Sequence, residues 1–209
     1  MSDELRDVPS HPPIASSEAV FEGAVWGIRR DVIRYPGGDI TREYMDHTGA
    51  VAVLVLDDQE RVLLIRQYRH PIRTRDWELP AGLLDIVGEV PLIGAQRELA
   101  EEADLAASEW HLLSEFATSP GGSDEVIRIY LARGIRDLPA FEREAEEADI
   151  EKRWVPLEEA VEAVLDRRVQ NSLLIVGVLA AEAARRRGWS SLGDPTEPWV
   201  RHPKFAPEA

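Results

Sequence analysis

Residues 82–105 read GLLDIVGEVPLIGAQRELAEEADL, and this stretch decides how the rest of the chain is interpreted. Its apolar side chains recur at helical spacing and form one stripe, made of Leu92, Ala95 and Leu99. Pro91 stands where a helix can begin, because its missing amide hydrogen would have no partner in the first turn. The pattern therefore predicts an amphipathic helix from Pro91 to Ala103.

Three glutamates flank the apolar stripe of this predicted helix. Glu98 and Glu102 are about 40° apart on the helix, one turn from each other, and Glu101 lies within a further third of the circumference. Like charges at this spacing repel each other unless a cation lies among them. Hard divalent cations take carboxylate oxygens as ligands, and Arg97 is spaced to pair with Glu101 and orient it. If residues 97–102 are taken alone, the alternative to a metal site is an acidic helix face that is solvated.

Short apolar runs around the helix predict β-strands. They are residues 50–56, 62–68, 77–79, 110–117, 126–132 and 154–155. The first two are predicted to form a hairpin around the polar turn at 57–60, and Pro80-Ala81-Gly82 is predicted to end the third. Two further helices are expected at about 157–167 and 171–187. This order indicates an α/β fold, with a mixed β-sheet sandwiched between α-helices.

Composition changes along the chain suggest four parts. Residues 1–15 are expected to be a disordered tail, and residues 16–49 a small β-rich N-terminal subdomain with a turn at Tyr35-Pro-Gly-Gly38. Residues 50–188 form the expected main domain, in which 133–152 is acidic and irregular. Residues 189–209 are expected to be a C-terminal tail.

The net charge of the 209-residue chain is −15, which argues against a nucleic-acid partner because phosphate backbones bind clustered lysine and arginine. A small phosphorylated substrate remains compatible if divalent metal ions neutralise it. Cysteine is absent, the first 13 residues do not resemble a signal peptide, and no apolar run is long enough to span a bilayer. We expect a cytoplasmic protein without a membrane partner.

The stretch quoted above resembles the signature of the Nudix hydrolases, Gly-x5-Glu-x7-Arg-Glu-U-x-Glu-Glu-x-Gly-U, where U is aliphatic. Here one residue is inserted between Gly82 and Glu89, and Asp104 stands where the family has glycine. The insertion falls in a loop. Asp104 ends the helix, where a left-handed conformation is expected that aspartate tolerates better than most residues.

The resemblance implies metal-dependent hydrolysis of a diphosphate bond. It assigns metal binding to Glu98, Glu102 and Glu101, with the Ala81 carbonyl as an extra ligand, and Mg²⁺ or Mn²⁺ as the cofactor. It further implies that the catalytic base comes from the acidic loop 144–150, with Glu147 the first candidate and Glu146 the second.

Several features resemble the ADP-ribose branch of this family, whose products are AMP and ribose 5-phosphate. Pro120 lies sixteen residues beyond Asp104, within Ser119-Pro-Gly-Gly122, as in that branch. The run 77–82 is also similar. The implied substrate-binding residues are Arg69, a diphosphate clamp, together with Glu78, Pro120, Gly121, Trp26 and Arg42, of which Trp26 and Arg42 are weaker candidates for adenine contact.

In similar enzymes the β-rich N-terminal region is exchanged with a partner subunit, which implies a homodimer. The alternatives are hydrolysis of another nucleoside diphosphate sugar or of a flavin or nicotinamide dinucleotide. A non-catalytic, nucleotide-sensing module of the same fold is a more remote alternative, because this chain keeps all four signature glutamates.

Overall fold

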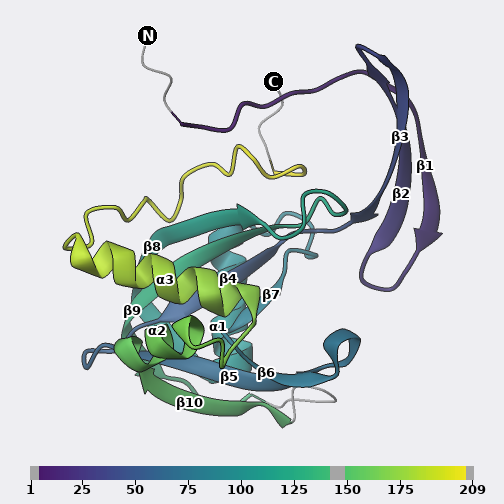
Figure 1. Cartoon of the computed structure of the whole chain (residues 1–209). Helices are drawn as coiled ribbons and strands as arrows, with labels where there is room; N and C mark the ends of the chain where they lie inside the picture. The colour runs from purple at the N-terminus through teal and green to yellow at the C-terminus, as the bar shows by residue number, and fades with distance from the viewer. Residues whose placement is uncertain (1–4, 142–148, 206–209) are drawn as a thin grey trace. The chain divides into compact units, whose positions relative to one another are not determined.

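The computed structural model describes residues 5–141 and 149–205, so the candidate bases Glu146 and Glu147 lie outside the described residues (Figure 1). The chain divides into two compact units. The smaller comprises residues 1–48, 119–125 and 198–209, and the larger comprises 49–118 and 126–197. Each unit is described on its own.

Two β-sheets and three α-helices build the larger unit. One sheet is mixed, with the strand order β7-β4-β9-β8: Ala81–Leu83, Ala50–Val55, Val126–Asp137 and Leu105–Ala117. The other is antiparallel, with the order β10-β5-β6: Glu151–Pro156, Arg61–Arg69 and Thr74–Glu78. The helices are α1 (Pro91–Ala103), α2 (Leu157–Leu165) and α3 (Ser172–Arg186), and a short 3-10 turn, η1, spans His70–Ile72.

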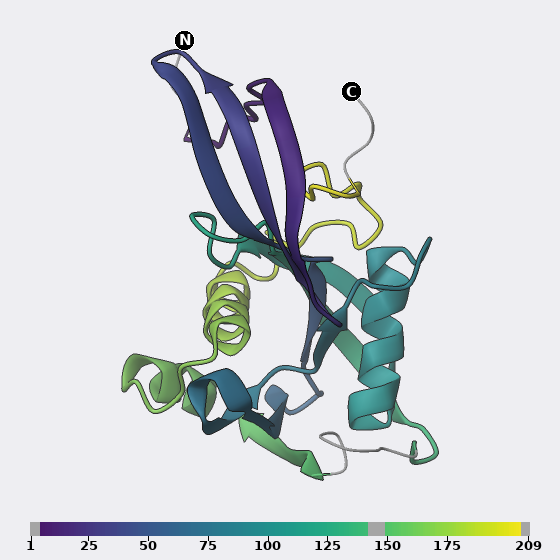
Figure 2. The ribbon, with the colours of Figure 1, turned by 90° about the vertical axis from the view of Figure 1, so that its right-hand side faces the viewer.

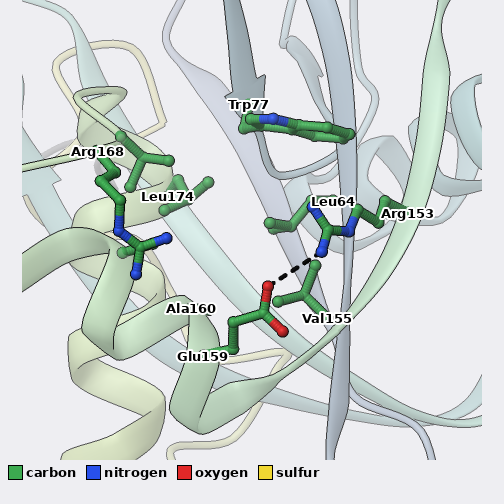
Figure 3. Close-up of a pocket in the computed structure, with 10 residues that line it drawn as sticks. Leu64, Trp77, Arg153, Val155, Glu159, Ala160, Arg168 and Leu174 are labelled. Atoms are coloured by element: carbon green, nitrogen blue, oxygen red, sulfur yellow. Dashed lines mark hydrogen bonds and ion pairs between the residues drawn. The ribbon is translucent and has the colours of Figure 1, made fainter.

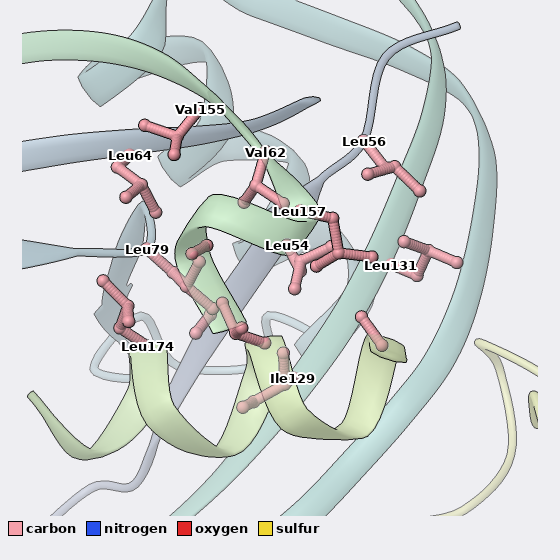
Figure 4. Close-up of a cluster of buried hydrophobic side chains, with 14 of the residues drawn as sticks. Leu54, Leu56, Val62, Leu64, Leu79, Ile129, Leu131, Val155, Leu157 and Leu174 are labelled. Carbon is pink, nitrogen blue, oxygen red and sulfur yellow. The ribbon is translucent and has the colours of Figure 1, made fainter. Parts of the chain in front are cut away.

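Helices cover both faces of the mixed sheet. Figure 2 shows α1 on one side of these strands and α3 on the other. Successive side chains of a strand point to opposite faces. Accordingly, Ala52 and Leu54 of β4 pack in the core with Leu174 and Val178 of α3 (Figure 4). The valines that alternate with them are fully buried toward the α1 side. The predicted α/β sandwich is confirmed.

The predicted hairpin of the first two strands is wrong. β4 is a central strand, paired with β9 in parallel and with β7 in antiparallel orientation, so both of its edges are occupied. Only a single bridge, Leu56 to Val62, joins it to the next strand. Between them Glu60 adopts a positive φ of 55°, and β5 continues in the other sheet.

Other boundaries also differ from the prediction. Residues 81–83 form β7 on the edge of β4 instead of a simple turn, and β9 continues through Asp137 into the segment expected to be irregular. The segment from Gly188 contains no helix or strand over its described residues. Its first part, residues 188–197, belongs to the larger unit, where Gly193 pairs with Leu112 and the guanidinium of Arg133 lies 4.1 Å from the Trp189 ring.

Three antiparallel strands form the smaller unit: β1 (Ile14–Glu22), β2 (Gly27–Tyr35) and β3 (Gly38–Asp46). The turn predicted at residues 35–38 is confirmed. β1 begins inside the segment expected to be disordered, and all nine of its residues are exposed. Across the described ranges 5–141 and 149–205, no helix is long and apolar enough to cross a membrane.

Asp104 ends α1 in the expected left-handed conformation, with φ 59° and ψ 36°. Its amide donates back to the carbonyl of Ala100. Its carboxylate accepts hydrogen bonds from Lys152 Nζ at 2.6 Å and from the Phe141 amide at 2.8 Å. This carboxylate therefore ties the end of α1 to β10, which glycine at the same position would not do.

We predict that Asp104→Ala lowers the free energy of unfolding by about 1–3 kcal/mol, because alanine loses both hydrogen bonds and strains the left-handed backbone. Asp104→Gly should cost less, since glycine adopts this conformation without strain. Urea unfolding followed by circular dichroism measures both values. Equal stability of the alanine and glycine variants would contradict this account of the helix end.

Candidate active site

Arg97 is the centre of an ion-pair network on α1. Its Nε and Nη2 each donate to Glu89 at 3.0 Å, and its Nη1 donates to Glu98 at 2.5 Å and to Glu101 at 3.0 Å. The predicted pair with Glu101 is confirmed, and two further carboxylates join it. Glu89 lies in the loop before the helix, so Arg97 fixes that loop to the glutamate-bearing face.

Two glycines allow these carboxylates to approach the backbone. A Cβ at Gly82 would lie 1.9 Å from the Glu98 carboxyl carbon, and a Cβ at Gly94 would lie 2.9 Å from a Glu89 carboxylate oxygen. Any side chain at Gly82 would displace Glu98. The close approach at Gly94 was not predicted from the sequence, although a glycine inside a helical pattern often marks close packing.

Glu102 is the most deeply buried carboxylate of the cluster, with only 6% of its surface exposed. It accepts a hydrogen bond from the Ala81 amide at 2.8 Å. Burial, together with the charges of Glu98 and Glu78, raises the pKa of Glu102 to about 8, against the opposing effects of the Ala81 amide and Arg69. A buried carboxylate of this kind is stabilised by a proton or by a cation.

Arg69 and Glu78 form a bidentate pair beside Glu102. Arg69 Nε and Nη2 donate to the two Glu78 oxygens at 2.8 and 2.6 Å. Glu78 is 2% exposed and also lies 3.5 Å from the Gln67 amide nitrogen. The Arg69 side chain is partly exposed, so the buried carboxylate orients a guanidinium that remains accessible.

The carboxylate cluster fits a divalent metal by its donor chemistry. The atoms that it offers to a metal are oxygens, and burial disfavours the charged form of Glu102 unless a cation is present. Gly82 has no side chain, so its backbone lies directly against the Glu98 carboxylate. No group of three or more acidic or histidine side chains in the described residues is already arranged around a metal position. Arg97 forms ion pairs with Glu98 and Glu101 at the edge of this cluster.

The remaining predicted residues belong to the smaller unit. Trp26 lies 6.3 Å from Phe21 between ring centroids, beside a cavity that Asp46 and Lys204 also line. Arg42 is exposed on β3 and donates to the Thr41 carbonyl. Pro120 and Gly121 lie in the turn 119–123, which pairs with the end of β3 through Met45.

An α/β sandwich with an arginine-bound glutamate helix beside a buried Arg-Glu pair is the architecture expected of a diphosphate hydrolase with carboxylate metal ligands. The chain belongs to the NUDIX family, because the NUDIX domain matches residues 46–174. The predicted family and enzyme class are thereby confirmed.

The proteins that are similar to this chain include two ADP-ribose pyrophosphatases and one solved hydrolase structure. An ADP-ribose pyrophosphatase of Mycobacterium tuberculosis is 48% identical over 80% of this chain and 82% of its own length. An ADP-ribose pyrophosphatase of Bacillus subtilis is 34% identical over 75% of this chain and 85% of its own length. The crystal structure of an ADP compounds hydrolase has a TM-score of 0.72 and 20% identity, and the match covers 88% of this chain and 99% of that one.

The raised pKa of Glu102 predicts how stability depends on pH without metal. The folded-state pKa of about 8 lies above the ordinary 4.5, so the folded protein binds more protons between these values. Stability in chelator should therefore fall as pH rises through this range. Glutamine at position 102 has no proton to lose, so Glu102→Gln should not become less stable in this way. The variant should therefore gain in melting temperature relative to the wild type between pH 4.5 and pH 8.

Differential scanning fluorimetry in excess EDTA measures this difference. Glu109→Gln, at an exposed position on β8, is the control and should show no such trend. A difference that stays constant across the pH range would mean that burial does not favour the protonated Glu102.

Proposed function

We propose that this Nudix hydrolase cleaves the diphosphate bond of ADP-ribose to give AMP and ribose 5-phosphate. The observation that carries the proposal is the Arg69–Glu78 pair beside Glu102, because a guanidinium can bind a diphosphate and Glu102 is one of the carboxylates proposed to hold the metal. The similarity to two ADP-ribose pyrophosphatases supports ADP-ribose over other nucleoside diphosphate sugars and dinucleotides.

In the proposed mechanism each group of the larger unit has a separate task. Glu98, Glu102 and Glu101, with the Ala81 carbonyl, would hold Mg²⁺ or Mn²⁺. When bound, the metal would neutralise the diphosphate and acidify the attacking water. Arg69 binds a diphosphate oxygen, and Glu78 is a positioning residue that orients its guanidinium. We assign the proton transfer from water to Glu147, with Glu146 as the alternative.

The smaller unit supplies the proposed adenine contacts and the proposed dimer interface. Trp26 offers an indole for stacking and Arg42 a guanidinium, while Pro120 and Gly121 shape a loop for the substrate. β1 exposes every residue, including Val20 and Phe21, on a sheet of only three strands. Because such a sheet buries little by itself, we propose that it packs against a second copy.

The proposed homodimer predicts twice the monomer mass in light scattering at micromolar concentration. Phe21→Glu places a charge on the exposed β1 surface and should shift the mass toward the monomer. Leu165→Glu, at an exposed position at the end of α2, is the matched control and should stay dimeric. A wild-type monomer with full activity would exclude the dimer.

The metal-carboxylate assignment predicts that excess chelator abolishes ADP-ribose hydrolysis and that Mg²⁺ or Mn²⁺ restores it. Glu98→Gln and Glu102→Gln should each lower kcat by about 10²-fold or more, because each removes one charged oxygen ligand. The variants should remain folded, since the change relieves repulsion between like charges. Glu109→Gln should retain wild-type kcat.

A panel of diphosphate substrates, assayed with each metal and analysed by chromatography, measures these effects. ADP-ribose should give the highest kcat/KM, with AMP and ribose 5-phosphate as products. Turnover in excess chelator would refute metal dependence. A higher kcat/KM for another nucleoside diphosphate would make that compound the substrate in place of ADP-ribose and leave the metal assignment intact.

A general base acts in the transition state, so its loss should lower kcat with little change in KM. Glu147→Gln should lower kcat on the order of 10²–10⁴-fold, and Glu146→Gln by less. Steady-state kinetics on ADP-ribose measures both. The reverse order would make Glu146 the base, whereas wild-type kcat in both variants would exclude this loop and make Glu101 the next candidate.

A further inference from the structure

A cavity of about 220 Å³ lies between the β10-β5-β6 sheet and α2, within the larger unit. Its floor is apolar and includes Leu64, Val155 and Leu174. Figure 3 shows the indole of Trp77 across one side of this cavity, with charged side chains on the other sides. The cavity therefore combines an apolar floor and an aromatic ring with a charged rim.

The rim of the cavity is lined by charged side chains. Arg153 and Arg168 contribute two guanidiniums, and Glu159 contributes one carboxylate. Arg153 donates to Glu159 at 3.0 Å, and Arg168 Nε donates to Asp166 at 3.4 Å, so each guanidinium keeps further N–H groups for a ligand. Guanidiniums bind carboxylates and phosphates through paired hydrogen bonds, so the rim favours an anionic group.

Trp77 gives the cavity a flat surface for a ring. Its indole forms part of the wall, and the guanidinium of Arg66 lies 5.0 Å from the ring centroid. Planar rings stack on indole, and their burial over Leu64 and Val155 removes apolar surface from water. A simple inorganic anion would use the rim and leave this surface empty.

Strand alternation separates this cavity from the active site. Trp77 and Glu78 are successive residues of β6, so their side chains point to opposite faces of the sheet. Glu78 binds Arg69 on the face that carries the catalytic residues, whereas Trp77 lines the cavity on the other face. Lys152 and Arg153 are successive residues of β10, and their side chains also point to opposite faces. Lys152 donates to the Ala103 carbonyl at the end of α1, whereas Arg153 lines the cavity.

We propose that this cavity is a second binding site, which takes a small organic anion with a single flat ring. The ring stacks on Trp77, and the acidic group binds the guanidiniums of Arg153 and Arg168. The size supports one ring, because an engineered 150 Å³ cavity in another protein holds benzene. A volume of about 220 Å³ adds room for one carboxylate or phosphate group.

The test is calorimetric titration of the full-length wild-type protein with phenyl phosphate and with benzoate, in EDTA so that no metal binds the phosphate. Both probes should bind with one site per chain. Arg168→Gln should weaken the binding about tenfold, since it removes a charge-assisted hydrogen bond. Glu159→Gln should strengthen it several-fold, because Arg153 then has no competing carboxylate.

Two arginine variants serve as controls. Arg136→Gln removes an exposed arginine of β9 outside the cavity and should leave the affinity unchanged. Arg69→Gln changes the active site and should also leave it unchanged, because the two faces of the sheet are separate. Comparison of phenyl phosphate with benzoate distinguishes a phosphate from a carboxylate as the preferred acidic group.

Three results would overturn the proposal. The first is that neither probe binds at millimolar concentration. The second is that Arg69→Gln weakens the binding as much as Arg168→Gln, which would place the probe in the active site. The third is that inorganic phosphate binds as tightly as phenyl phosphate, which would show that the ring makes no contact with Trp77.

Discussion

The candidate active site depends on one guanidinium, that of Arg97, which offsets the repulsion between glutamates on one face of α1. Glu98, Glu101 and Glu102 would repel one another on α1, and Arg97 contacts two of them together with Glu89 of the preceding loop. The same contacts fix the loop between β7 and the helix, while Ala81, held in β7 by its pairing with β4, donates its amide to Glu102. The ion pairs therefore organise the backbone as well as the side chains.

The second organising feature is the alternation of side chains along β5, β6 and β10. One face of this sheet carries the Arg69–Glu78 pair toward the carboxylates, and the other carries Trp77 and Arg153 toward α2. Two chemically different surfaces thus share the same three strands. β5 pairs with both β6 and β10, and the pleat of each paired strand directs successive side chains to opposite faces.

Much of this arrangement could be predicted from the sequence, because local patterns determine it. The period of the apolar residues gave α1 with its correct ends, and the left-handed Asp104 followed from its position after the helix. The pairing of β4 could not be predicted in this way, since its partner β9 is more than 70 residues distant in the chain. The partners of Arg97 in the loop, and the close approach that Gly94 permits, also depend on tertiary packing.

We infer that Arg97 organises the glutamates for a divalent metal instead of competing with it. Calorimetric titration with Mn²⁺ of the wild type and of Arg97→Met tests this claim, because the two roles predict opposite changes. If Arg97 organises the site, the variant should bind Mn²⁺ about 10–100-fold more weakly, as on loss of other partners that orient metal ligands. Tighter binding by Arg97→Met would show that the guanidinium competes with the metal, and would contradict the account.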